Sequence, residues 1–147
     1  MSIFSAIDIS ASGLTAQRLR MDTISQNIAN VNTTRTTGGG PYRRKLVVFE
    51  AREAQDGFAG MFSRALEKQQ TGQGVRAVGI VEDNTPPKMM YDPNHPDAND
   101  QGYVMLPNVN IVTEMVDMIS ATRAYEANTA AVRSSKDIAL KALEIGR

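Results

Sequence analysis

The chain has 147 residues, of which 41% are hydrophobic, and this is enough for one modest domain or two small ones. Sixteen basic and sixteen acidic residues cancel, so no overall field favours nucleic acid or an anionic membrane. The sequence contains no cysteine, which excludes disulfides, zinc–thiolate sites and thiol catalysis.

The first eight residues have no positive cluster and no unbroken apolar run, so a cleaved secretory signal is not expected. Nowhere does the sequence contain the roughly 18 consecutive apolar residues that indicate a membrane-spanning helix.

The first predicted element is a long amphipathic helix over residues 3–31. Apolar side chains recur along it at nearly heptad spacing, most regularly at Ile7, Leu14, Met21 and Ile28. Several Asn and Thr residues then end it, because their side chains compete for backbone hydrogen bonds. Gly13 lies inside this helix at a cost of about 1 kcal/mol relative to Ala. It indicates either the close approach of another backbone or a tolerated flexible position.

The middle of the chain, residues 34–107, predicts a central loop and a small β-rich part. A Gly-Gly-Gly-Pro segment at 38–41 cannot continue a helix and indicates a loop. Four short apolar runs, separated by turn residues, predict strands near 46–49, 75–81, 88–91 and 103–106. Residues 53–70 fit either a strand or a helical turn.

A second long helix is predicted over residues 110–145, with Asn110 as its N-cap and Glu114 in its first turn. Its apolar stripe is expected to meet that of the first helix. This stripe comprises Val112, Met115, Ile119, Tyr125, Val132, Ile138, Leu143 and Ile145.

The predicted fold is therefore mainly α with a small β-rich insert. Residues 1–33 and 108–147 form a coiled-coil-like helical domain, and residues 34–107 form the second part. Such helices have little core of their own, so their folding is expected to be coupled to assembly. We expect the seam within or between subunits to contain Ile7, Leu14, Met21, Ile28, Ile119, Tyr125 and Val132.

No catalytic, cofactor or metal site is expected. The single histidine, His95, lies in a Pro/Asn/Asp turn that is more typical of a solvated loop than of a metal site. No phosphate-binding glycine loop and no nucleophile–base pair occur. The one basic cluster, residues 42–45, is too small for nucleic acid and indicates a solvated or partner-facing loop.

Motifs near the two ends resemble the signatures of bacterial flagellar axial proteins. The first combines Ser12-Gly13-Leu14 and Gln17 with residues 24–33, which read Ile-Ser-Gln-Asn-Ile-Ala-Asn-Val-Asn-Thr. The second contains Asn108-Val109-Asn110 and the Ala-Thr-Arg-Ala-Tyr-Glu-Ala-Asn segment at 121–128, and is similar to the ends of rod and hook proteins. The short length, the 39–45 segment, the 92–96 turn and the ending at 141–147 resemble the proximal rod proteins more narrowly.

This resemblance implies a structural subunit of the flagellar basal-body proximal rod, which assembles helically into a torque-transmitting shaft around an export channel. It implies a periplasmic position in the basal body, reached through the flagellar type III apparatus without a cleaved signal. The implied partners are copies of the same chain, other rod proteins and the base at the membrane ring, without nucleic acid or membrane insertion. Motif positions expected to make polar subunit contacts are Gln17, Asn27, Asn30, Arg123, Glu126 and Asn128.

Two other classes of protein compete with this interpretation. A soluble coiled-coil adaptor or export chaperone explains the amphipathic helices equally well, but not the two signatures in their proper order. An enzyme acting on cell-wall polymer needs an acid/base carboxylate pair in a cleft, and no such pair stands out in the sequence.

Overall fold

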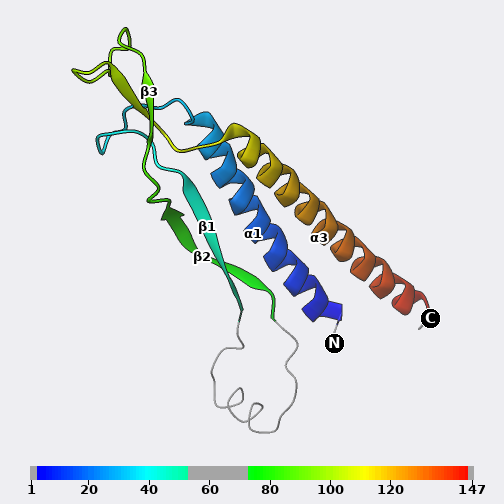
Figure 1. Cartoon of the computed structure of the whole chain (residues 1–147). Coiled ribbons are helices and arrows are strands. Elements are labelled where there is room, and N and C mark those ends of the chain that lie inside the picture. The colour runs from blue at the N-terminus through cyan, green and yellow to red at the C-terminus, as the bar shows by residue number, and fades with distance from the viewer. Residues whose placement is uncertain (1–2, 53–72, 146–147) are drawn as a thin grey trace, which may run out of the picture.

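The computed structural model describes residues 3–52 and 73–145. Within them the chain forms two long helices and four short strands (Figure 1). In order these are α1 (Ile3–Ala29), β1 (Lys45–Ala51), β2 (Val75–Glu82), β3 (Lys88–Tyr91), β4 (Tyr103–Leu106) and α3 (Ile111–Ile145). The predicted fold class is confirmed, and each predicted strand overlaps an observed one. The ambiguous segment 53–70 lies outside the described residues.

The two helices lie side by side and run antiparallel, with both termini at one end of the pair (Figure 1). Their contact is lined by small side chains, and Ala16 and Ala121 are buried. Small residues allow two helix backbones to approach closely. α1 ends two residues earlier than predicted, at Ala29. The Gln26 carbonyl accepts both the backbone amide and the side-chain carboxamide of Asn30 at this end.

Most of the apolar stripe predicted on the second helix does not face the first one. Val112, Met115, Ile119, Ile138 and Leu143 are all at least half exposed, so the prediction that they meet α1 is wrong. Of the stripe, Val132 is half-buried. The contacts with α1 are made mainly by polar residues of α3, which are Glu114, Asp117, Thr122 and Asn128. Polar contacts set this register, because they must be satisfied inside the chain.

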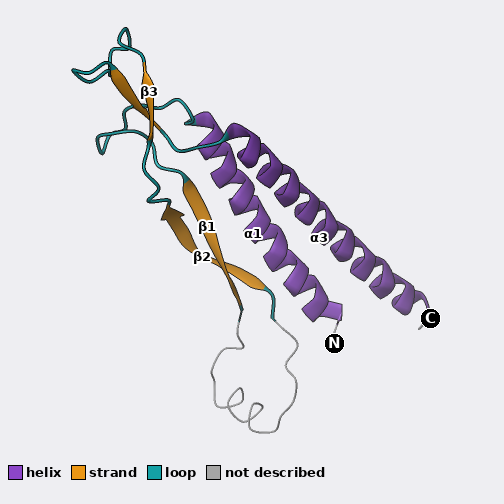
Figure 2. Cartoon of the chain, in the orientation of Figure 1, coloured by secondary structure: helices purple, strands orange, loops and turns teal. Residues whose placement is uncertain are grey.

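The β1–β2 pair packs on α1, on the side away from α3 (Figure 2). The strands are antiparallel, with a register shift between Val48 and Phe49. Side chains of β1 alternate, so that Val47 and Phe49 are half-buried while Leu46 and Val48 are exposed. α1 is therefore the central layer of the molecule. None of the described helices is both long and apolar enough to cross a membrane.

The start of β2 is fastened to α1 through Ser12. The Ser12 hydroxyl donates to the Ile9 carbonyl at 2.6 Å and accepts the Val75 amide at 3.1 Å. Gly74, just before the strand, has a φ of +99°, and a Cβ there would overlap the Ser12 Oγ. Only glycine fits this crossing of strand and helix without displacement.

β3 and β4 form an antiparallel hairpin beyond the end of the helix pair (Figure 1). Its long turn is closed by a bond from the Asp92 amide to the Gly102 carbonyl and by the Asn99 carboxamide oxygen, which accepts the amides of Gln101 and Tyr103. On the inner side, Val104 is 1% exposed and anchors the hairpin to the rest of the chain.

Replacing Gly74 by alanine should lower the free energy of unfolding by about 1 to 3 kcal/mol, because it adds backbone strain and a clash with Ser12. Thermal unfolding followed by circular dichroism measures this effect. Gly38→Ala is the matched control, since nothing lies within 4 Å of a Cβ at that position. Equal melting temperatures for the two variants would contradict the proposed fit.

Candidate functional site

A cluster of polar side chains joins the C-terminal end of α1, the segment before β1 and the first turns of α3. We call it the polar junction, and it comprises Arg20, Asn27, Tyr42, Arg44, Glu114 and Asp117. Asn27 and Glu114 are each 1% exposed, so water cannot satisfy them. Each needs partners inside the protein.

Asn27 uses both ends of its carboxamide. Its Nδ2 donates to the Lys45 carbonyl at 2.9 Å and to Glu114 Oε2 at 3.1 Å. Its Oδ1 accepts the Lys45 amide at 2.9 Å and the Tyr42 hydroxyl at 3.0 Å. The Asn27 side chain therefore links α1 to the first residue of β1, to Tyr42 in the segment before β1, and to α3.

Glu114 is a buried carboxylate with a charged partner. Arg44 Nε donates to its Oε1 at 2.6 Å, and Arg44 Nη2 lies 3.4 Å from Asp117 Oδ2. Asp117 also lies 3.4 Å from Arg20 of α1. Two cations thus face two anions at the N-terminal end of α3, where the helix dipole also favours negative charge. A buried carboxylate paired in this way is costly to unpair.

Burial raises the pKa of the Tyr42 phenol, and the negative charges of Glu114 and Glu82 raise it further. The neutral phenol is the form that donates to Asn27. Tyr42 and Arg44 belong to the basic cluster that the sequence indicated as a solvated or partner-facing loop. That interpretation is wrong for these two residues, which are partly buried and bonded within the chain.

The second close approach lies further along the helix pair, at Gly13. A Cβ at this position would come within 3.0 Å of the Asn128 carboxamide, which bonds to the Ala124 carbonyl of its own helix. The sequence left open whether Gly13 marks a close contact or a tolerated position. The structure assigns it a close contact, made by a side chain and not by another backbone.

The remaining residues expected at a seam or subunit contact are distributed as follows. Five of the predicted seam residues are half-buried, namely Ile7, Leu14, Met21, Ile28 and Val132. The other two are more exposed, Tyr125 by 37% and Ile119 by 58%. Arg123 and Glu126 are exposed on α3. Asn30 accepts the Thr33 hydroxyl at the end of α1. Gln17 Oε1 is buried and accepts no hydrogen bond from the described residues.

Next to the polar junction, the outward side of α3 carries a cluster of exposed apolar side chains. We call it the α3 patch, and it comprises Val112, Met115, Val116 and Ile119, which are between 54% and 70% exposed. The sequence identified three of these residues but assigned them to contact with the first helix. Contiguous exposed apolar surface of this kind marks an interaction site.

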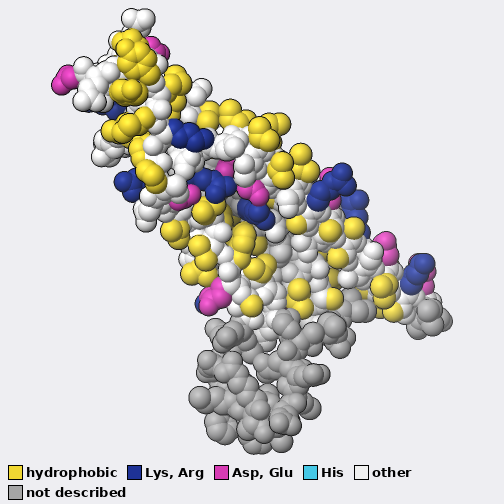
Figure 3. Space-filling model, in the orientation of Figure 1, with side chains coloured by type: hydrophobic (Ala, Val, Ile, Leu, Met, Phe, Trp, Pro, Cys, Tyr) yellow, Lys and Arg dark blue, Asp and Glu magenta, His cyan; other side chains and the backbone are white. Residues whose placement is uncertain are grey.

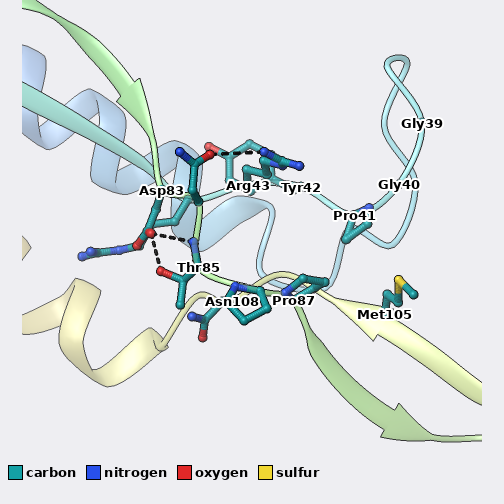
Figure 4. Close-up of a pocket in the computed structure, with 13 residues that line it drawn as sticks. Gly39, Gly40, Pro41, Tyr42, Arg43, Asp83, Thr85, Pro87, Met105 and Asn108 are labelled. Atoms are coloured by element: carbon teal, nitrogen blue, oxygen red, sulfur yellow. Dashed lines mark hydrogen bonds between the residues drawn. The ribbon is translucent and has the colours of Figure 1, made fainter.

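The Gly-Gly-Gly-Pro segment at residues 38–41 forms a loop, which we call the glycine loop. A hollow of about 370 Å³ lies between it and the segments that follow β2 and β4 (Figure 4). Arg43 donates to Asn84 across it at 3.4 Å, and Asp83 accepts the Thr85 hydroxyl and amide, which lowers the pKa of this carboxyl. The residues that line it include no nucleophile–base pair. Among the described residues, no group of three His, Cys, Asp or Glu side chains is placed to hold a metal ion.

Both ends of the chain match known families of axial proteins. Residues 7–35 match the family described as "Flagella basal body rod protein", and residues 100–145 match "Flagellar basal body rod FlgEFG protein C-terminal". These matches cover most of α1 and all of α3. The chain thus carries, at its two terminal helices, the sequence signatures of flagellar rod-type proteins.

Curated relatives narrow this class. The "Flagellar basal-body rod protein FlgC" of Borreliella burgdorferi is 52% identical, with 99% of this chain and 98% of the relative covered. The proteins of the same name from Bacillus subtilis and Escherichia coli O157:H7 are 44% and 35% identical, with both chains covered completely. The chain belongs to the family of the flagellar basal-body rod protein FlgC.

Replacing Asn27 by alanine should lower the free energy of unfolding by about 2 to 4 kcal/mol, because it leaves Glu114, Tyr42 and the Lys45 backbone without buried partners. Denaturant unfolding of the purified chain measures this. Asn32→Ala, in an exposed position shortly after the same helix, is the control and should change stability by less than about 0.5 kcal/mol. An equally small effect at Asn27 would show that the junction does not hold the fold.

Tyr42 should make stability fall at alkaline pH. Its pKa is raised in the folded state, so the unfolded chain loses this proton first, and stability declines as pH rises above about 10. Tyr42→Phe should cost about 1 kcal/mol at pH 7 and lose less stability between about pH 9 and pH 11. The measurement is the free energy of unfolding against pH, with Tyr125→Phe as the control. If this free energy falls equally between about pH 9 and pH 11 in the two variants and the unaltered chain, Tyr42 is not the cause.

Proposed function

We propose that this chain is a structural subunit of the flagellar basal-body proximal rod. Membership of the FlgC family supports this role, and the α3 patch is the single structural observation that carries it. Four large apolar side chains stand exposed on one helix, while the polar groups beside them are satisfied within the chain. A surface of this kind fits a protein that works by packing against other subunits.

In this proposal the α3 patch packs against another rod subunit, either a second copy or another rod protein. A contact between two different surfaces of identical subunits repeats around a screw axis and builds an open tube. Torque is then carried by many helix contacts along the shaft. The exposed Arg123 and Glu126 on α3 supply polar contacts at the edge.

We also propose how the parts of the chain are arranged in the rod. The helical residues 1–33 and 108–147 form the inner part around the export channel, and residues 34–107 form the outer part. The rod lies in the periplasm, and the chain reaches it through the flagellar type III apparatus without a cleaved signal. The base that couples the rod to the membrane ring is a further partner.

The relatives are named as rod proteins, and neither those names nor the two matching families support the adaptor or export-chaperone alternative. The same names give no activity that would favour an enzyme. No cofactor, nucleic acid or membrane insertion is part of the proposal.

Ile119→Asp should prevent incorporation into the rod and abolish motility, because it places a charge within the α3 patch. Export should continue, since the residue is 58% exposed and the fold does not depend on it. The measurement is complementation of a strain that lacks the gene, with isolation of basal bodies and assay of the exported chain.

Ala131→Asp is the control, because Ala131 is exposed on the same helix but lies outside the α3 patch. This variant should restore motility. Normal motility of the Ile119→Asp strain would remove the α3 patch from the assembly surface.

A further inference from the structure

One edge of β1 has no partner strand among the described residues. β1 pairs only with β2, in a two-stranded antiparallel sheet. Near its start β1 lies between β2 and the helix pair, so its free edge faces the helices (Figure 1). Along an antiparallel strand, the backbone groups of successive residues point alternately to its two sides. Every second residue of β1 therefore presents its N–H and C=O groups at the free edge.

Backbone hydrogen bonds at the two ends of the ladder identify these residues. The Asp83 amide donates to the Arg44 carbonyl, and the Arg52 amide donates to the Gly74 carbonyl, both at 2.8 Å. The register shift within the sheet adds a residue to β2 and leaves the alternation along β1 intact. Even-numbered residues of β1 thus bond to β2. The odd-numbered residues at the free edge are Lys45, Val47, Phe49 and Ala51.

Asn27 already occupies this edge at Lys45. Its carboxamide accepts the Lys45 amide and donates to the Lys45 carbonyl, each at 2.9 Å. These are the two bonds that a residue of a neighbouring antiparallel strand would make. The backbone groups of Val47 and Phe49 bond to no other group within residues 3–52 and 73–145. We call these two residues the open edge of β1.

The open edge lies beside a hollow of about 270 Å³, which we call the β1 hollow. Thr23 and Ile24 of α1 line it, as do Glu114 and Asp117 in the first turns of α3. A chain placed there would run along β1 and over α1. An added strand needs only about 4.8 Å beside β1, whereas a helix needs about 10 Å. The β1 hollow therefore suits a single extended segment.

The β1 hollow contains more basic than acidic side chains. Arg20, Arg44 and Lys45 line it against Glu114 and Asp117. Arg44 pairs closely with Glu114, at 2.6 Å, whereas Arg20 reaches only Asp117, at 3.4 Å. The Arg20 guanidinium has several N–H donors and makes only this long bond with the described residues. Basic and acidic side chains gather where the start of β1 lies beside the helices (Figure 3). One further carboxylate would complete this set.

We propose that the open edge of β1 binds an extended segment of another protein as an added strand, with an Asp or Glu side chain of that segment at Arg20. Addition of a strand to a free sheet edge is a recurring mode of recognition, in which backbone bonds provide affinity and side chains provide specificity. Here the bonds are made at Val47 and Phe49. The charge-assisted bond to Arg20 selects an acidic segment.

The structure favours another protein over a second copy as the source of the strand. All four described strands of this chain are paired in two-stranded sheets. A strand from a second copy would bring its paired strand with it, and this strand would meet α3 on the far side of the β1 hollow. The inference rests on the proposed rod function for the place of the partner, which is a neighbouring subunit of a different rod protein.

The exposure of this edge also needs a physical reason. A free sheet edge invites non-specific pairing, and folded proteins commonly protect it with charge, proline or a covering segment. In β1, Asn27 and Lys45 protect only the first position. The next two positions lie open beside a hollow. An edge that is covered at one end and open beyond it fits a site that defines where an added strand stops.

Amide NMR of the purified full chain tests strand addition directly. The probe is the peptide acetyl-Thr-Val-Asp-Val-Thr-amide at up to about 5 mM, a range that includes the weak affinity expected of a few backbone bonds. We expect the amides of Val47 and Phe49 to shift and to become protected from exchange. Those of Leu46 and Val48, which already face β2, should change little. The peptide with Asn in place of Asp should bind about fivefold more weakly.

Two results of this titration would overturn the proposal. The first is the absence of any change at Val47 and Phe49. The second is the same change when the concentration of the chain is raised without peptide, which would assign the edge to a second copy.

Val47→Pro tests the edge without removing a bond of the sheet. Proline lacks the N–H group, but this group of Val47 lies outside the β1–β2 ladder, so the sheet should persist. Binding of the peptide should weaken by at least about tenfold. Val47→Ala keeps the N–H group and is the matched control, with binding changed by less than about twofold. Equal affinities of the two variants would overturn the proposal.

Arg20→Gln gives an independent measurement that does not alter the strand. This variant should bind the Asp and Asn peptides equally, because the partner of the carboxylate is lost. Circular dichroism checks that both variants are folded. An unchanged preference for the Asp peptide would reject Arg20 as the carboxylate site.

Cells distinguish failure of this contact from failure of the proposed function. Loss of Val47→Pro from isolated rods, with Val47→Ala incorporated, is the result expected if both hold. If Val47→Pro is incorporated while Ile119→Asp is not, strand addition in the rod is rejected and the rod function stands. If the unaltered chain is absent from isolated rods, the rod function itself is rejected.

Discussion

The contact between Asn27 and Glu114 is the constraint on which the rest of this structure depends. It joins residues 87 positions apart in sequence, and both side chains are 1% exposed. Because a buried carboxamide and carboxylate must find partners, the contact fixes the register of α3 on α1 and the place where β1 begins. Arg44 completes it by neutralising Glu114. The helix pair and the sheet are thereby held by one network.

This register has a consequence for the surface. It directs small and polar residues of α3 towards α1 and leaves larger apolar residues outside. The helix pair buries little apolar area for its length, so close packing at Ala16, Ala121 and Gly13 and the polar network must provide much of its specificity. The apolar surface left over is available to neighbouring subunits. A chain that buries little apolar area by itself, and more when it associates, suits a protein that must assemble.

The α3 patch lies along the side of the helix pair and is the exposed surface on which the proposed assembly contact rests. The glycine loop and its hollow, in contrast, show no residues arranged for chemistry.

The sequence by itself determined the two helices, the four strands and the two axial-protein signatures, because these depend on local periodicity, turn residues and short motifs. It also marked Asn27, Gly13 and Asn128 as motif positions without indicating what they contact. Only the tertiary structure decided which side of α3 faces α1 and that Arg44 and Tyr42 are bonded inside the chain. Apolar periodicity specifies that a helix has a face to bury, but not whether its own chain or a neighbour buries it. That choice was made by buried polar groups far apart in sequence, which had to pair with one another.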